Sequence, residues 1–330
     1  MFPKQKSFMQ NAIPILLNYN IDPLHGFLPG EDPLKKFTNP LNALDQISAN
    51  LPTLLMAGKL HSAISELQLP NFQEIEDTHQ LQRAMLLLSV LGNAYVWGGK
   101  EPIKIIPRNI SVPWQQVAEK LDRPMIVAHA SMVLNNWRRL DKNKPLALDN
   151  LDTLQTFLGG MDEKWFYLVT VMVEAKGAPA LPAIVNAQQA AANNSIDGLA
   201  ENLPVIVTAV KEMQAMLEHM PEKCDPYIFY HRVRPFLRGW EEPGIIYEGV
   251  NEVPQKLFGG SAAQSSLLQS IDAGLGITHP AEETNNFLLE MRNYMPPKHR
   301  QFIEAIETGP SIRQFVSLKL KEYPKLADLY

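Results

Sequence analysis

Apolar residues recur at the i, i+3, i+4 spacing of an amphipathic helix along most of this chain. Sustained alternation of apolar and polar positions, which is the pattern of a half-buried strand, is hard to find. Proline and glycine separate the periodic segments, as they commonly do between helices. The pattern therefore predicts a mainly α fold, with helices over residues 42–69, 79–97, 113–139, 148–158, 164–175, 180–219, 262–275, 281–294 and 297–307.

A polar and charged stretch with a proline, residues 140–150, interrupts this pattern near the middle of the chain. Such stretches are typical of boundaries between domains. A chain of 330 residues is long enough for two ordinary domains. We therefore expect a smaller, mostly helical N-terminal domain, residues 1–147, packed on a larger helical domain, residues 148–330.

Charge and cysteine content narrow the possible partners. The formal net charge of −5 gives no basic field that would attract nucleic acid. Cys224 is the only cysteine, so an internal disulfide and a thiolate metal cluster are both excluded. Pro14 interrupts a short apolar stretch near the N-terminus, and no run of 18 apolar residues occurs. We expect a cytoplasmic monomer that binds neither nucleic acid nor a membrane.

Common catalytic motifs are absent from the sequence. It contains no H-E-x-x-H, no G-x-x-x-x-G-K, no G-x-S-x-G, and no G-x-G-x-x-G after a strand. The 8 histidines show no paired metal-ligand spacing. Hydrolases, zinc enzymes and nucleotide-dependent enzymes are therefore disfavoured.

Residues 229–240, FYHRVRPFLRGW, place Arg234 in an aromatic and apolar stretch. An unpaired guanidinium is costly to bury, so we expect a carboxylate partner, either from the protein or from a ligand. The planar fork of arginine binds a carboxylate with two parallel hydrogen bonds. Because the residue before a proline disfavours helical geometry, a helix that arrives through Phe229 should end or kink at Arg234. An internal acid and a ligand both remain open as the partner.

Residues 259–266, GGSAAQSS, lead into another apolar helix. Ser261 and Gln264 have the spacing of a capping box, in which each side chain accepts the backbone N–H of the other residue. Gly259 and Gly260 allow close approach of the backbone. The segment is either a plain helix start or a cradle for a carboxylate, because free N–H groups at a helix start attract anions.

Residues 164–174, KWFYLVTVMVE, form a third informative segment. Phe166, Thr170 and Val173 lie on one helical face, at i, i+4 and i+7, which places one hydroxyl on an apolar surface. Such a face either packs into the core or lies against a flat apolar cofactor or an aromatic substrate.

Seven motifs occur in order along the chain: AYVWG (94–98), VLNNW (133–137), FYLVTVMVE (166–174), RPFLRGW (234–240), YEG (247–249), GGSAAQSS (259–266) and MRNYMPPKHR (291–300). Together they closely resemble the indoleamine 2,3-dioxygenase family, over residues 18–330. The resemblance implies a haem b enzyme that adds both atoms of O2 across the C2–C3 bond of the indole of L-tryptophan, giving N-formylkynurenine. It also implies that the haem lies between the two domains and that an electron donor keeps the iron ferrous.

The resemblance assigns roles to individual residues. Arg234 would hold the substrate carboxylate, Phe229 and Phe166 would contact the indole, and Thr170 would stand at the catalytic position near bound O2. Further substrate positions are His129, Met132, Val133, Tyr230, Leu237, Gly260 and Ala262. Cofactor positions are Ser261 and Ala262 over the haem edge and propionate, Val173, and Asp272, which would support the axial ligand of the iron.

Three features depart from the usual pattern of the family. Thr170 stands where serine or alanine is common, so it adds a methyl group near O2 and supplies no strong base. His129 stands where tyrosine is common, and it either hydrogen-bonds a substrate substituent or lines the wall. The proximal histidine of the family lies on a helix after the segment that ends here at Tyr330, so we expect a shortened chain with an unknown metal ligand. His299 is the alternative ligand within the chain.

Two other functions stay open. One is a relative that binds haem and an indole but catalyses another reaction, such as the rearrangement carried out by similar enzymes of the pyrrolnitrin pathway. The other is a non-catalytic helical binding protein without haem, in which Arg234 forms only an internal ion pair.

Overall fold

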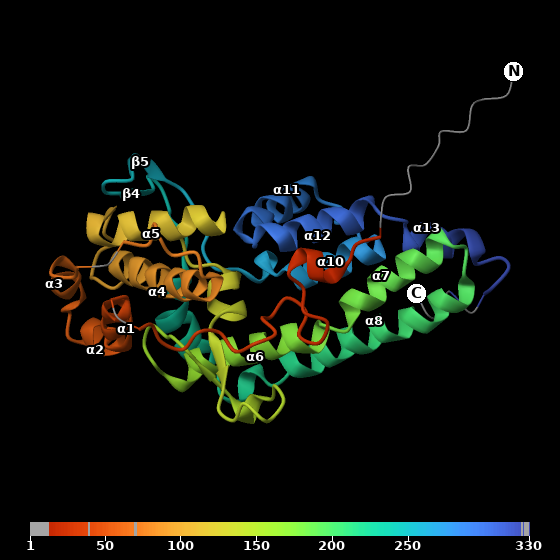
Figure 1. Ribbon diagram of the computed structural model, residues 1–330, viewed down its shortest axis with the longest axis horizontal. Coiled ribbons are helices and arrows are strands. Elements are labelled where there is room, and N and C mark those ends of the chain that lie inside the picture. The colour runs from red at the N-terminus through yellow and green to blue at the C-terminus, as the bar shows by residue number, and fades with distance from the viewer. Residues whose placement is uncertain (1–12, 39, 69–70, 325, 327–329) are drawn as a thin grey trace, which may run out of the picture.

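Helices make up most of the structure, a computed structural model that describes residues 13–330 except 39, 69–70, 325 and 327–329 (Figure 1). The prediction of a mainly α fold is therefore confirmed. The α-helices are α1 (Asn42–Ala49), α2 (Leu51–Met56), α3 (Leu60–Ser65), α4 (Thr78–Trp97), α5 (Arg108–Leu121), α6 (Met161–Gly177), α7 (Ala180–Ala192), α8 (Ile196–Leu217), α9 (Pro226–Ile228), α10 (Ser266–Leu275), α11 (Glu282–Met291), α12 (Pro297–Thr308) and α13 (Ile312–Lys319).

Shorter helical turns connect these helices. Two of them, η2 (Ala130–Leu134) and η5 (Phe229–Val233), are π turns. The 3₁₀ turns are η1 (Leu16–Tyr19), η3 (Leu148–Asn150), η4 (Met220–Glu222), η6 (Arg234–Leu237), η7 (Ala262–Gln264) and η8 (Arg292–Tyr294).

Two small sheets occur within the described residues. In the first, β4 (Ile245–Tyr247) pairs in parallel with β1 (Ile105–Ile106) and antiparallel with β5 (Asn251–Gln255). In the second, β2 (Trp137–Arg139) pairs antiparallel with β3 (Leu151–Thr153).

The second sheet shows that one predicted helix was right only in part and another was wrong. The segment 113–139 contains most of α5, but Asp122 takes a left-handed conformation (φ 48°) that ends the helix. The chain then continues through η2 into β2. The segment 148–158 forms η3 and β3, in which Leu151 and Thr153 are buried and the residue between them is half-buried.

Two longer predicted helices are each divided into shorter ones. The segment 42–69, whose last residue lies outside the described residues, forms α1, α2 and α3, and Gly58, with a φ of 64°, lies between the last two. The segment 180–219 forms α7 and α8, which are separated by Asn194 in a left-handed conformation. Ser195 then caps α8, because its hydroxyl accepts a hydrogen bond from the N–H of Gly198 at 3.1 Å.

Among the described residues, two large hydrophobic cores lie along the length of the molecule, one at each end of the view in Figure 1. The first surrounds α4 and α5 and includes Tyr247 and Met291 from the second half of the sequence. The second lies among α6, α7, α8, α10 and α12 and includes Phe27 and Leu28 from the first half. Each core thus contains residues from both sides of residue 147, and a domain boundary there stays a prediction.

One stretch of the described residues, Met161–Ala192, is long and apolar enough to cross a membrane. It comprises α6 and α7, and 67% of its most apolar window is buried inside the structure. Both helices pack against α8. The protein core therefore accounts for these apolar side chains.

Candidate functional site

One face of α6 is left partly open. Phe166, Thr170 and Val173 are half-buried, whereas most of the other residues along the middle of this helix are buried. The hydroxyl of Thr170 donates a hydrogen bond to the carbonyl oxygen of Phe166 at 2.7 Å. Because its proton is engaged in this bond, the Thr170 hydroxyl can accept a further hydrogen bond but has no proton left to give.

The Arg234 segment lies against this face. The ring centre of Phe229 is 4.2 Å from that of Phe166, and the planes are inclined by 32°. The chain changes from the π turn η5 to the 3₁₀ turn η6 at Arg234, so the predicted break in the helix is present. Arg234 nevertheless keeps helical torsion angles, with φ −54° and ψ −34°.

The side chain of Arg234 is exposed, although its aromatic sequence context suggested burial. Its guanidinium carbon lies 5.2 Å from the ring centre of Tyr230, which is itself 56% exposed. Among the residues that the structure describes, no carboxylate forms an ion pair with Arg234. The internal acid partner, one of the two alternatives, is therefore not observed.

A buried asparagine holds the backbone of the Arg234 segment. The side-chain amide of Asn93 on α4 donates hydrogen bonds to the carbonyl oxygens of Phe236 and Arg238, at 3.0 and 3.1 Å. On the other side, the N–H of Gly260 donates to the carbonyl oxygen of Leu237 at 3.1 Å. The segment is therefore fixed between α4 and the loop Gly259–Ser265.

The predicted capping box is present in this loop. Ser261 accepts a hydrogen bond from the N–H of Ala263 at 3.2 Å, and Gln264 accepts one from the N–H of Ser261 at 3.3 Å. However, this box caps only the short turn η7, and α10 begins at Ser266 with Ser265 as its own cap. The functional alternative of an anion site at this helix start therefore has less support than the plain cap.

The two glycines of the loop differ in their surroundings. A Cβ atom at Gly259 would lie 2.1 Å from the carbonyl oxygen of Leu237, so only glycine allows this approach. A Cβ atom at Gly260 would meet nothing within 4 Å. Gly260 therefore borders open space.

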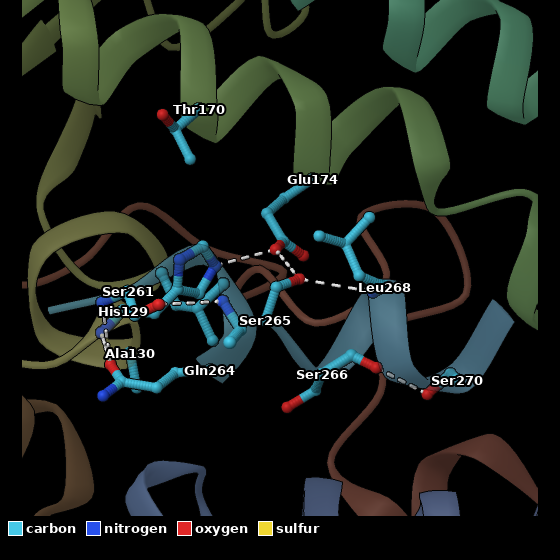
Figure 2. Close-up of polar contacts among 12 residues, drawn as sticks. His129, Ala130, Thr170, Glu174, Ser261, Gln264, Ser265, Ser266, Leu268 and Ser270 are labelled. Carbon is cyan, nitrogen blue, oxygen red and sulfur yellow. Dashed lines mark hydrogen bonds and ion pairs between the residues drawn. The ribbon is translucent and has the colours of Figure 1, made fainter. Parts of the chain in front are cut away.

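A buried polar cluster joins His129, α6 and the loop (Figure 2). One carboxylate oxygen of Glu174 lies 2.7 Å from Nε2 of His129 and accepts a hydrogen bond from the hydroxyl of Ser265 at 2.6 Å. Gln264 accepts a hydrogen bond from the backbone N–H of His129 at 3.0 Å. The sequence interpretation missed the roles of Glu174 and Ser265, and the only available signal was an acid at the end of an apolar helical run.

The other predicted site positions are spread over the same segments. Met132 and Val133 are buried in η2, which packs against α6. Leu237 and Ser261 are half-buried, and Ala262 is exposed.

Asp272 lies at the far end of α10 from the loop. Nε2 of His279 is 3.1 Å from its carboxylate, and both residues line a cavity of about 380 Å³. In the structure, the acid that the resemblance assigns to the support of an axial ligand thus pairs with a histidine of this chain.

His299 lies in the second core. Its ring centre is 4.6 Å from that of Phe27, and its Nδ1 atom is buried without a hydrogen-bond partner among the described residues. Burial lowers the pKa of His299 to about 3. Within the part of the chain that the structure describes, no group of three or more histidine, cysteine, aspartate or glutamate side chains could hold a metal ion.

Comparison with known proteins gives a consistent result. Residues 15–330 match the sequence model of the family described as indoleamine 2,3-dioxygenase. Indoleamine 2,3-dioxygenase 1 of Rattus norvegicus is 38% identical over 319 residues, which cover 93% of this chain and 78% of the relative. Indoleamine 2,3-dioxygenase 2 of Homo sapiens is 35% identical, over 93% of this chain and 77% of the relative. Indoleamine 2,3-dioxygenase of Saccharomyces cerevisiae is 34% identical, over 92% of this chain and 73% of the relative. The chain therefore belongs to the indoleamine 2,3-dioxygenase family, which is a family of oxidoreductases.

Proposed function

We propose that this protein is a haem-dependent dioxygenase that opens the indole ring of L-tryptophan with O2 and forms N-formylkynurenine. The observation that carries this proposal is Arg234, an exposed cation without a carboxylate partner among the described residues, on the same segment as Phe229, whose ring packs against Phe166. A carboxylate and an indole on one small molecule match this combination of groups. The names of the relatives support the same substrate class.

Arg234 binds the substrate carboxylate in this proposal. Its donors are free to form charge-assisted hydrogen bonds, each worth about 1.5–3 kcal/mol. The neighbouring ring of Tyr230 supports the guanidinium through a cation–π contact. The hydrogen bonds from Asn93 hold the backbone of this segment in place, so less conformational freedom is lost on binding.

The open face of α6 binds the indole ring. The Phe166 and Phe229 side chains form an aromatic surface, and Thr170 and Val173 continue it along the helix. Aromatic rings pack well in offset or inclined arrangements against such a surface. Met132 and Val133 come from η2, which packs against the same helix.

The residues present fit a haem group beside this surface. The half-buried face of α6 offers an apolar surface to a flat molecule, Gly260 borders open space, and Val173, Ser261 and Ala262 would hold the edge of the group. When bound, haem would supply the iron that activates O2. Asp272 and His299 stay predictions as residues near the iron, and the burial of His299 against Phe27 disfavours it as a ligand.

Thr170 acts as an acceptor and a steric wall. Its proton is engaged by the carbonyl oxygen of Phe166, and a hydroxyl is a poor base. This residue therefore cannot remove the indole proton. Its role is to limit the space above the reacting carbon atoms.

We further propose that the enzyme works as a cytoplasmic monomer with a separate electron donor. The single cysteine, Cys224, is buried and free, which fits a reducing compartment.

The direct test is product analysis with isotopic O2. The purified full-length protein is loaded with haem, reduced, and given L-tryptophan under ¹⁸O2. We expect N-formylkynurenine that carries two ¹⁸O atoms, detected by mass spectrometry. A rearranged product without both oxygen atoms would favour a different reaction of the same pocket, and a full-length protein that takes up no haem, shown by the lack of a Soret band, would overturn the proposal.

A further inference from the structure

A single carboxylate oxygen joins two sides of the candidate site. Oε1 of Glu174 is within hydrogen-bonding distance of Nε2 of His129, at 2.7 Å, and of the hydroxyl of Ser265, at 2.6 Å (Figure 2). The side chain of Glu174 is 3% exposed, and that of His129 is 5% exposed. The other oxygen of Glu174 is buried and has no hydrogen-bond partner among the described residues. His129 and Ser265 therefore both depend on Oε1 of Glu174.

The side chain of Gln264 provides a second connection between His129 and the loop Gly259–Ser265. Its side-chain oxygen accepts hydrogen bonds from the N–H of His129 and from the N–H of Ser261, at 3.0 and 3.3 Å. Its side-chain nitrogen donates to the carbonyl oxygen of Gly259 at 2.9 Å. The loop Gly259–Ser265 is therefore tied to His129 at its C-terminal end, and the Gln264 side chain also holds the N-terminal end of the loop.

The burial of Glu174 makes these contacts interdependent. A buried carboxylate is costly unless donors satisfy it, and hydrogen bonds to a charged group are stronger than those between neutral groups. Glu174 can therefore stay inside only while His129 and Ser265 both face it. The contact also favours the tautomer of His129 that carries hydrogen on Nε2.

We propose that Glu174 is a positioning residue that couples the His129 side of the site to the loop Gly259–Ser265, and thereby holds the ligand-contacting residues at a fixed separation. The inference rests on the proposed function, because it assumes that this site binds haem and tryptophan. Glu174 touches neither ligand in this role. It acts through His129 on one side and through the loop residues Gly260 and Ser261 on the other.

Loss of this coupling leaves the loop tied to His129 through Gln264 alone, so the loop moves away from α6 more often. Ligand binding then has to order the loop as well, so affinity falls. The chemical step is less affected, because the residues that face the reacting atoms are unchanged. The Michaelis constant for tryptophan should therefore rise more than kcat falls.

The test measures hydrogen exchange in the haem-free chain, so that it does not depend on activity. In Glu174→Met, we expect the amides of residues 259–265 to exchange about tenfold faster than in the wild type. In Glu174→Gln, one side-chain oxygen can still accept both hydrogen bonds, and exchange should stay within about threefold of the wild type.

Glu163 on the same helix provides a matched control. It is fully buried and accepts hydrogen bonds from the N–H groups of Phe157 and Leu158, at 2.6 and 2.8 Å. We expect Glu163→Met to lower the melting temperature without faster exchange in residues 259–265. The proposal is wrong if Glu174→Met leaves this exchange unchanged, or if Glu163→Met raises it equally.

Kinetics of the haem-loaded chain complete the test. With Glu174→Met, we expect the Michaelis constant for tryptophan to rise about tenfold and kcat to fall less than about threefold. A fall in kcat at an unchanged Michaelis constant would contradict a positioning role. If the wild-type chain forms no N-formylkynurenine but Glu174→Met frees the loop, the proposed function fails and the coupling stands.

Discussion

The buried wall and the exposed rim of the candidate site use polar groups in opposite ways. In the wall, Glu174 and His129 are buried and form hydrogen bonds to other parts of the protein. At the rim, Arg234 and Tyr230 are exposed, and the guanidinium has no carboxylate partner among the described residues. The wall is therefore suited to hold the shape of the site, whereas the rim keeps its hydrogen-bond donors for a ligand.

Two arginines show the same contrast. Arg123 is buried, and its guanidinium donates hydrogen bonds to the side-chain oxygens of Gln82 and Ser131, at 3.0 and 2.6 Å. Burial lowers the pKa of Arg123 to about 10. Arg234, in the more aromatic sequence context, is the exposed one. Aromatic neighbours in the sequence therefore do not indicate that an arginine is buried.

The largest expected effect is on the free energy of unfolding at acidic pH, and it tests how buried polar groups behave in this protein. The pKa of His299 is lowered from 6.5 to about 3 in the folded chain because the ring is buried. Between pH 6.5 and about 3, the unfolded chain binds more protons at this residue than the folded chain does. The contribution of the neutral, buried ring to stability is therefore complete above pH 6.5 and is lost as the pH falls towards 3. The loss amounts to about 5 kcal/mol over this range.

Urea unfolding at a series of pH values measures this effect. We expect His299→Leu to show a clearly flatter dependence of the unfolding free energy on pH than the wild type below pH 6.5. His231→Leu, at an exposed histidine, serves as the control. Equal slopes for the wild type and His299→Leu would show that His299 already takes up its proton in the folded chain.

The second prediction addresses the rim. Arg234→Ala should lower kcat/KM for tryptophan about tenfold to hundredfold, because charge-assisted hydrogen bonds of about 1.5–3 kcal/mol each are lost. The unfolding free energy should change by less than about 0.5 kcal/mol, because the side chain is exposed.

Arg238 is the matched control for this variant. It is also exposed, and its guanidinium carbon lies 5.8 Å from the ring centre of Trp97. Arg238→Ala should keep kcat/KM within about twofold of the wild type. If Arg234→Ala instead destabilises the fold while kcat/KM stays unchanged, Arg234 is structural and the contrast between wall and rim is broken.

The smallest effect is expected at Thr170. Its hydroxyl proton is engaged by the carbonyl oxygen of Phe166, so Thr170→Ala should change kcat less than about threefold. Thr170→Val keeps the volume and removes the hydroxyl, and it should behave like the wild type in steady-state kinetics. A hundredfold fall in kcat for both variants would show that the hydroxyl takes part in the reaction.

Helices with strong local signals could be predicted closely from the sequence. The predicted segment 79–97 corresponds to α4, which Asp77 caps by accepting a hydrogen bond from the N–H of Gln80. The predicted segment 297–307 corresponds to α12, which starts with a proline at its first position. In contrast, β3 was predicted as a helix because its conformation depends on pairing with β2, which local periodicity does not reveal.

Residues of the candidate site could likewise be predicted only where their own segment of sequence carried the signal. Arg234, Phe229 and Phe166 carry recognisable chemistry in their own segments, and the structure brings the two phenylalanines together. The contacts of Glu174 join residues that are 45 and 91 positions apart, at His129 and Ser265. Only the three-dimensional fold reveals such contacts.

The amide of Asn93 has a consequence for how the specificity of this enzyme can change. It binds the carbonyl oxygens on both sides of Leu237, so it fixes the course of the main chain and leaves the rim side chains free. Substitutions at exposed rim positions such as Tyr230 can then accumulate without loss of the fold. A population of such variants can explore new ligands while the backbone that presents them stays the same.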